Sequence, residues 1–297
     1  MQRISILLAV VALFLISLLQ AQTQAVNTDA QQPSAAHSHF PKVTIANSEL
    51  RTIRSTSTGR DYDLYIHIPK QYDKDQTAKY PVLYLLDAQW EFKLVEQVVG
   101  GLVFDQYMPD VIIVGITYSG ENADYDGLRA MDLTPTPTEG IKGSGDGPKF
   151  LKFLKTELIP FVEASYRVDP ARRVLLGGSL GGLFTLYAMF SDPSLFSGYL
   201  ANCPAVLLGW PNHPFFKQEA DYARLHKDLP VKLYVAVGGW DGLSGPVQEF
   251  VHIIRSRNYQ GLQLETRVIE GERHAGIGPE ADNRGLMFLF SEPVAQP

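Results

Sequence analysis

One segment limits the possible folds of this chain more than any other: residues 173–188, R-V-L-L-G-G-S-L-G-G-L-F-T-L-Y-A. The apolar run at its start is typical of a strand buried on both faces of a sheet. A short apolar helical pattern, Leu183–Phe190, follows directly. The glycines around Ser179 allow two backbones to approach without a Cβ clash. The segment therefore predicts a buried strand, a tight turn and a helix, the unit from which α/β folds are built.

The same alternation extends over most of the chain. The β-rich runs are Leu50–Thr56, Tyr62–Ile68, Val82–Leu86, Val111–Tyr118, Val174–Gly177, Gly198–Asn202, Val231–Val237 and Leu262–Ile269. The helical patterns are Lys149–Tyr166, interrupted at Pro160, then Leu183–Phe190, Val247–Arg257 and Asn283–Phe290. This order predicts an α/β fold with an eight-stranded, mostly parallel sheet flanked by helices. Residues 120–147 and 204–214 are predicted to be loops, and a loop as long as the first is often a lid or binding loop.

The N-terminus resembles a secretory signal. Arg3 precedes an apolar run of 16 residues, Ile4–Leu19, and a small-residue exit follows. This pattern predicts a signal peptide at residues 1–25 and a periplasmic or secreted protein, with an uncleaved membrane anchor as the alternative. Residues 26–41 are predicted to be a flexible lead-in, and residues 42–297 a single α/β domain.

Composition excludes several classes of function. Lys and Arg total 26 against 32 Asp and Glu, a net charge of −6, and no basic stripe is present. Binding to nucleic acid or to an anionic membrane surface is therefore not expected. The lone Cys203 excludes an intramolecular disulfide and a cysteine metal cluster, and its position after an apolar run predicts burial. His37 and His39 are too sparse for a metal site, so no metal or other cofactor is expected.

The pentapeptide Gly177–Gly181 matches G-x-S-x-G between a strand and a helix, the nucleophile turn of the α/β-hydrolase fold. A serine hydroxyl needs a base to take its proton. In this fold the triad runs in the order Ser, Asp or Glu, His. His274 follows the last β-rich run and is predicted to be the base, whereas His252 lies inside a helical pattern and is interpreted as a helix residue.

Asp241 follows the seventh β-rich run in a glycine-rich loop and is predicted to orient the imidazole. A turn aspartate is the plainer interpretation, and Glu249 and Asp228 are weaker candidates for the same role. The oxyanion is predicted to bind the amides of Leu180 and Gln89, with Ala88 as the alternative to Gln89.

Two further predictions concern the substrate pocket. Trp90, Trp240 and Trp210 flank predicted catalytic or irregular segments, and at least two of them are predicted to line the pocket, with core packing as the alternative. Arg129 is predicted to pair with Asp132, and a contact to substrate is its alternative role. Asp87 is predicted to brace the loop after the third strand.

A family resemblance rests on Tyr84–Asp87, Glu157–Pro160, Arg173–Gly182 and the closing R-H-A-G. These motifs resemble the putative esterase family, which includes esterase D, enterobactin and salmochelin siderophore esterases, feruloyl esterases and mycolyltransferases. Ala88 and Cys203 depart from its usual Gly and Ser.

The resemblance implies Ser179, Asp241 and His274 as the triad and Gln89 and Leu180 as oxyanion donors. Some siderophore esterases use a Ser–His pair, which implies a smaller role for Asp241 than for Ser179 and His274. The predicted function is serine-dependent hydrolysis of a carboxylic ester, of siderophore or small acyl type, through an acyl-enzyme. Acyl transfer of the mycolyltransferase type and non-catalytic binding are the alternatives.

Overall fold

A computed structural model of the chain describes residues 43–206 and 214–291. The predicted signal peptide, the lead-in and Trp210 lie outside the described residues. Residues from Ile45 onward form one compact unit. None of the helices within the two described stretches combines the length and apolarity needed to cross a bilayer.

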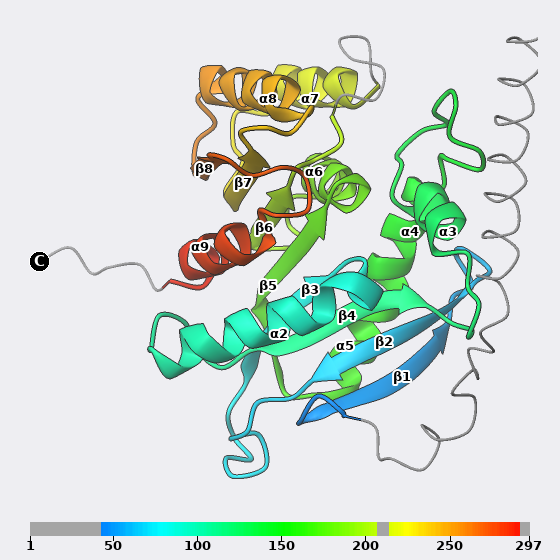
Figure 1. Cartoon of the computed structure of the whole chain (residues 1–297), viewed down its shortest axis with the longest axis vertical. Helices are drawn as coiled ribbons and strands as arrows, with labels where there is room; N and C mark the ends of the chain where they lie inside the picture. The colour runs from blue at the N-terminus through cyan, green and yellow to red at the C-terminus, as the bar shows by residue number, and fades with distance from the viewer. Residues whose placement is uncertain (1–42, 207–213, 292–297) are drawn as a thin grey trace, which may run out of the picture. The chain divides into compact units, whose positions relative to one another are not determined.

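A central sheet has eight strands in the order β1-β2-β4-β3-β5-β6-β7-β8 (Figure 1). The strands are β1 (Ser48–Arg54), β2 (Asp61–His67), β3 (Tyr80–Leu85), β4 (Ile112–Tyr118), β5 (Val168–Gly178), β6 (Gly198–Asn202), β7 (Lys232–Gly238) and β8 (Gln263–Ile269). β1 pairs antiparallel to β2 and β2 to β4, and the remaining neighbours are parallel. β3 and β4 are buried along their whole length, as continuous apolar runs require. The predicted fold class and all eight strands are confirmed.

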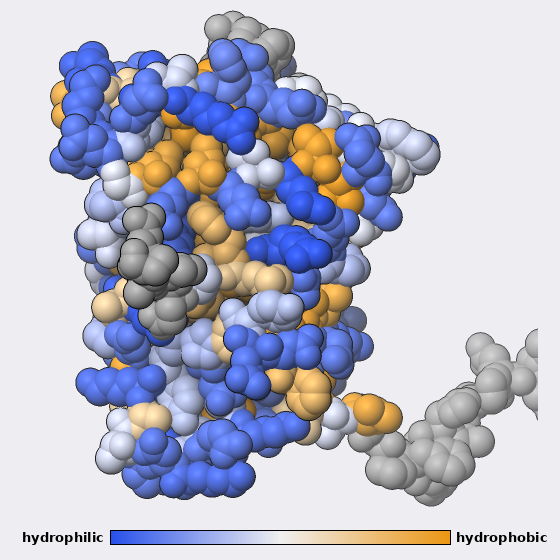
Figure 2. All heavy atoms as spheres, turned by 90° about the vertical axis from the view of Figure 1, so that its left-hand side faces the viewer, coloured by the Kyte–Doolittle hydropathy of each residue, from blue (hydrophilic) through white to orange (hydrophobic). Residues whose placement is uncertain are grey.

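Helices cover both faces of the sheet. They are α2 (Ala88–Phe104), α3 (Tyr125–Asp132), α4 (Gly147–Phe153), α5 (Ile159–Ser165), α6 (Leu180–Ser191), α7 (Pro214–Leu225), α8 (Ser244–Arg257) and α9 (Gly278–Phe290). α2 and α9 pack against each other and against the sheet (Figure 1). Figure 2 shows a band of hydrophobic residues between hydrophilic ones on the side that is to the left in Figure 1.

The predicted helix 149–166 is interrupted, as its proline suggested. A π-helical turn, Leu154–Leu158, separates α4 from α5, and Pro160 is the second residue of α5. Proline has no N–H to donate to the preceding turn, which favours a widened turn at this point. The prediction of one loop over residues 120–147 is wrong in part, because α3 lies within it.

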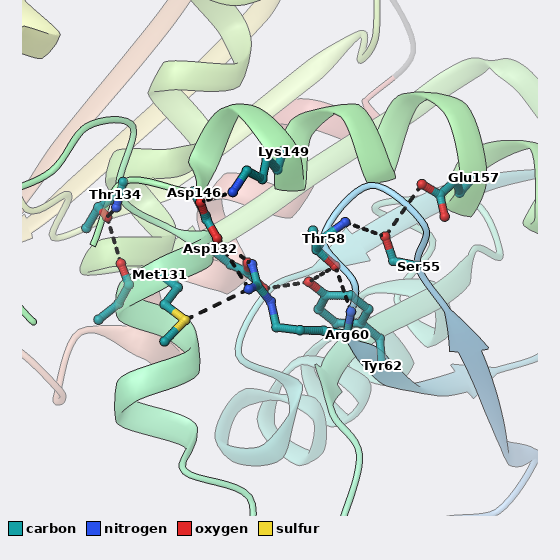
Figure 3. A network of polar contacts seen from close by, with 12 residues as sticks. Ser55, Thr58, Arg60, Tyr62, Met131, Asp132, Thr134, Asp146, Lys149 and Glu157 are labelled. Carbon is teal, nitrogen blue, oxygen red and sulfur yellow. Dashed lines mark hydrogen bonds and ion pairs between the residues drawn. The ribbon is translucent and has the colours of Figure 1, made fainter. Parts of the chain in front are cut away.

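A buried polar network fixes α3 and the long connection after β4 (Figure 3). The guanidinium of Arg60 pairs with the fully buried carboxylate of Asp132 and, at 3.3 Å, with Asp146. The Tyr62 hydroxyl donates to Asp132 Oδ2 at 2.7 Å. The predicted ion pair between Arg129 and Asp132 is therefore wrong: Asp132 faces the β1–β2 hairpin, while Arg129 turns toward the start of α2.

We expect Asp132→Asn to lower the free energy of unfolding by roughly 3 kcal/mol, because it removes the main partner of a largely buried guanidinium. Urea unfolding followed by circular dichroism measures this loss. Asp61→Asn is the matched control, since it breaks an exposed pair with Arg54 whose loss costs about 1 kcal/mol or less. Equal losses in the two variants would contradict a structural role for the buried pair.

Candidate active site

Ser179 occupies a strained turn between β5 and α6. Its backbone has φ 59° and ψ −117°, a conformation that non-glycine residues adopt only where the surroundings hold it. The Ser179 N–H donates to the Asn202 carbonyl at 2.9 Å, which fixes the turn against the end of β6. A Cβ on Gly177 would lie 2.4 Å from the Gly181 carbonyl oxygen, so the turn requires glycine there. The structure thus has the predicted strand, tight turn and helix.

His274 and Asp241 meet beside this turn. His274 follows β8 and Asp241 follows β7, and His274 Nδ1 lies 2.7 Å from Asp241 Oδ2. Asp241 Oδ1 also accepts from the Leu243 N–H at 3.0 Å. Burial raises the pKa of Asp241, but hydrogen bonds from Cys203, Leu243 and His274 outweigh it and hold the pKa below its usual value. The carboxylate is therefore charged at neutral pH, and His274 Nε2 is left for a second partner.

Cys203 is buried, as its position in the sequence predicted, but it is not only a packing residue. Burial and the nearby Asp241 carboxylate raise the pKa of the thiol to about 12, so the thiol stays protonated, and it donates to the His274 carbonyl oxygen at 3.7 Å. The Cys203 Sγ, an Asp241 carboxylate oxygen and a His274 ring nitrogen lie within 4.8 Å of one another. The thiol therefore lies against the pair that His274 forms with Asp241.

Ser179 and His274 line one pocket of about 320 Å³ at the carboxyl ends of the parallel strands, where such sheets place their ligand sites. Trp90 and Arg129 line it too, in agreement with two of the sequence predictions. Trp240 is not among the described lining residues and is 69% exposed, and Trp210 lies outside the described residues, so the prediction that at least two of the three indoles line the pocket is not confirmed. An indole at the tip of a glycine-rich loop faces solvent because no described element packs over it.

Arg129 braces the turn that precedes α2. Its guanidinium makes two parallel hydrogen bonds to Asp87, at 2.9 and 2.7 Å, and Asp87 has a φ of 54°. The pair confirms the prediction that Asp87 braces this loop. Gln89 is the second residue of α2, and Leu180 is the first residue of α6. Amides in a first helical turn have no partner within the helix, so both positions offer free donors.

The alternative triad candidates lie elsewhere. His252 and Glu249 are exposed on α8, and His252 lines a separate cavity. Asp228 lies before β7, where its carbonyl accepts a hydrogen bond from the Tyr222 hydroxyl. None of the three is among the described residues that line the pocket with Ser179.

Three polar residues of the pocket wall escaped the sequence analysis: Glu91, Asp126 and Asn202. Asn202 is the last residue of β6, and the rule that selected Asp241, a polar residue at a strand's carboxyl end, would also have selected it. Glu91 and Asp126 lie on α2 and α3, helices that the sequence analysis did not predict, although the helical spacing of Phe92, Val95 and Val99 could have indicated α2.

Comparisons with known proteins agree with this geometry. The model of a family described as "Putative esterase" matches residues 55–274. The ferri-bacillibactin esterase BesA of Bacillus subtilis is 29% identical over 269 residues, which are 83% of this chain and 91% of that protein. The siderophore triacetylfusarinine C esterase of Aspergillus fumigatus is 29% identical over 217 residues, 67% of this chain and 70% of that protein.

A solved structure is also similar. The crystal structure of the BES protein from Bacillus cereus superposes with a TM-score of 0.75 at 26% identity, covering 85% of this chain and 98% of that one. The family match extends over most of the chain, from the β1–β2 connection to His274. The chain belongs to the putative esterase family and is a carboxylic ester hydrolase.

Proposed function

We propose that the chain hydrolyses carboxylic esters through Ser179 as nucleophile, His274 as base and then acid, and Asp241 as the residue that orients the imidazole. One observation supports this above all: Ser179 and His274 line the same pocket while His274 Nδ1 is bonded to a carboxylate at 2.7 Å. That bond favours the tautomer whose Nε2 accepts a proton.

The acylation step follows from these positions. Ser179 Oγ attacks the acyl carbon, its proton moves to His274 Nε2, and the carbonyl electron pair moves to oxygen. The amides of Leu180 and Gln89 donate to the oxyanion, helped by the positive ends of two helix dipoles. The bond to the alkoxy group then breaks, the alcohol leaves with the His274 proton, and an acyl-enzyme remains.

Water completes the reaction by the reverse sequence. It loses a proton to His274 and attacks the acyl carbon, and the bond to Ser179 Oγ breaks as the proton returns to the serine. The imidazolium formed in each half-reaction is stabilised by the Asp241 carboxylate. The His274 side chain is 47% exposed, so water reaches the imidazole directly.

The names of the relatives suggest the kind of ester. BesA is named for ferri-bacillibactin and the Aspergillus fumigatus protein for triacetylfusarinine C, a siderophore. We propose siderophore esters or small acyl esters as substrates. Export to the periplasm or the medium, proposed from the N-terminal sequence, would bring the enzyme to such molecules.

Labelling with a fluorophosphonate tests the nucleophile. We expect the mature wild-type protein to gain one phosphonyl group, seen by intact mass, and peptide mapping to place it on Ser179, because only an activated serine displaces fluoride at a useful rate. Heat-unfolded protein is the control and should stay unlabelled. Labelling elsewhere, or none on folded protein, would refute the serine mechanism.

A further inference from the structure

The pocket above Ser179 has an excess of hydrogen-bond acceptors. Glu91 and Asp126 line it; neither carboxylate has a hydrogen-bond or ion-pair partner among the described residues, and the charge of Arg129 acts on both from a distance. Asn202 is 8% exposed, its Oδ1 is buried without a partner, and its Nδ2 donates to Asp282 at 2.7 Å. A buried acceptor without a donor is costly, so these groups favour a ligand that brings donors.

The positively charged side chain in the same pocket wall is already paired with a carboxylate. Arg129 is the one Arg or Lys among the described lining residues, and both its bonds go to Asp87. The wall therefore presents three carboxylates against one guanidinium.

Glu91 and Asn202 belong to one local electrostatic environment. Burial raises the pKa of Asp282 to about 7. The hydrogen bond from Asn202 lowers this pKa, and the charge of Glu91 raises it further. Burial, followed by the charge of Asp87, also raises the pKa of Glu91. Glu91 lies on α2 and Asp282 on α9, and these two helices pack against each other. A cation beside Glu91 favours the charged form of both carboxyl groups.

We propose that the preferred substrates are esters that bear a protonated amine, with the ammonium group donating to the Glu91 carboxylate and to Asn202 Oδ1 while the ester lies at Ser179. An ammonium group has three donors and no acceptor, the complement of this wall. An anionic ester meets uncompensated carboxylates there and binds less well. The inference rests on the proposed function and names its substrate class.

Three benzoate esters of similar length test the inference: 4-aminobutyl, n-pentyl and 4-sulfobutyl benzoate, with benzoate release measured by chromatography at pH 7.5. For wild type we expect kcat/KM to be about tenfold higher for the aminobutyl than for the pentyl ester, the size of one charge-assisted hydrogen bond, and lowest for the sulfobutyl ester. The difference should lie mainly in KM, because the amine is remote from the reacting bond.

Variants assign the preference to Glu91. In Glu91→Gln the ratio of aminobutyl to pentyl kcat/KM should fall about tenfold, to near one, and in Asp126→Asn it should fall by less. Glu249→Gln, which removes an exposed acid on α8, should keep the wild-type ratio. A wild-type ratio near one, or a ratio that Glu91→Gln leaves intact, overturns the inference while ester hydrolysis stands. Failure to cleave any of the three esters refutes the proposed function, and the inference with it.

Discussion

We expect Ser179→Ala to lower kcat for ester hydrolysis by about 10⁴-fold or more, the loss seen when a serine triad loses its nucleophile. The reason is geometric as well as chemical. The strained turn, held by the Asn202 carbonyl, presents a single hydroxyl to the pocket that His274 also lines. Alanine keeps the turn and removes only the attacking oxygen. Initial rates with p-nitrophenyl acetate and a benzoate ester measure the loss.

Ser256→Ala, on the exposed surface of α8, is the matched control and should keep wild-type rates. Circular dichroism of both variants checks that the fold is intact. If Ser179→Ala retains more than about one tenth of the wild-type kcat, the attacking group is not this serine, since an oriented water replaces a lost nucleophile only poorly.

Asp241→Asn is expected to lower kcat by about 10³- to 10⁴-fold. The carboxamide preserves the shape of the side chain but cannot stabilise the imidazolium. Its NH₂ group also favours the His274 tautomer with the proton on Nε2, and a protonated Nε2 cannot accept the hydroxyl proton of Ser179. The effect should fall on kcat more than on KM, because His274 becomes charged only during the reaction. Steady-state kinetics from pH 5 to 9 separate the two parameters.

Glu249→Gln serves as the control, because sequence analysis offered Glu249 as a weaker triad acid and the structure places it on α8, exposed to solvent. Its rates should match wild type. A loss below about tenfold in Asp241→Asn would instead show that a Ser–His pair suffices here and that Asp241 mainly positions the loop.

The sheet was predictable because burial on both faces forces continuous apolar runs. β3, β4 and β7 have such runs, and each run is too short for a typical helix, so it is read as a strand. α2 was not predictable in the same way. Phe92, Val95 and Val99 have helical spacing, but the pair Gly100–Gly101 lowers helix propensity. Contacts with the sheet and with α9 stabilise it instead, and such contacts are absent from a local pattern.

The features of the site also fall into those that the sequence predicts and those that it does not. Ser179, Asp241 and His274 were predictable because each follows a strand, and chain order then brings them to one edge of the sheet. The partner of Arg129 was not. Asp132 is three residues away on the same helix, yet the guanidinium turns to Asp87, 42 residues earlier. Spacing along the helix shows only which residues are near, whereas the fold pairs Asp132 with Arg60 and leaves Arg129 for Asp87.

The network around Arg60 has an evolutionary consequence. It anchors α3 to the β1–β2 hairpin through Asp132 and Asp146, independently of the strand ends that hold the serine and the histidine. Substitutions at Asp126 or Glu91 can therefore retune which molecules enter without disturbing the reaction itself. Proteins with this architecture can change their substrate preference by exchanging a few residues of the pocket wall, while the residues that carry out hydrolysis stay unchanged.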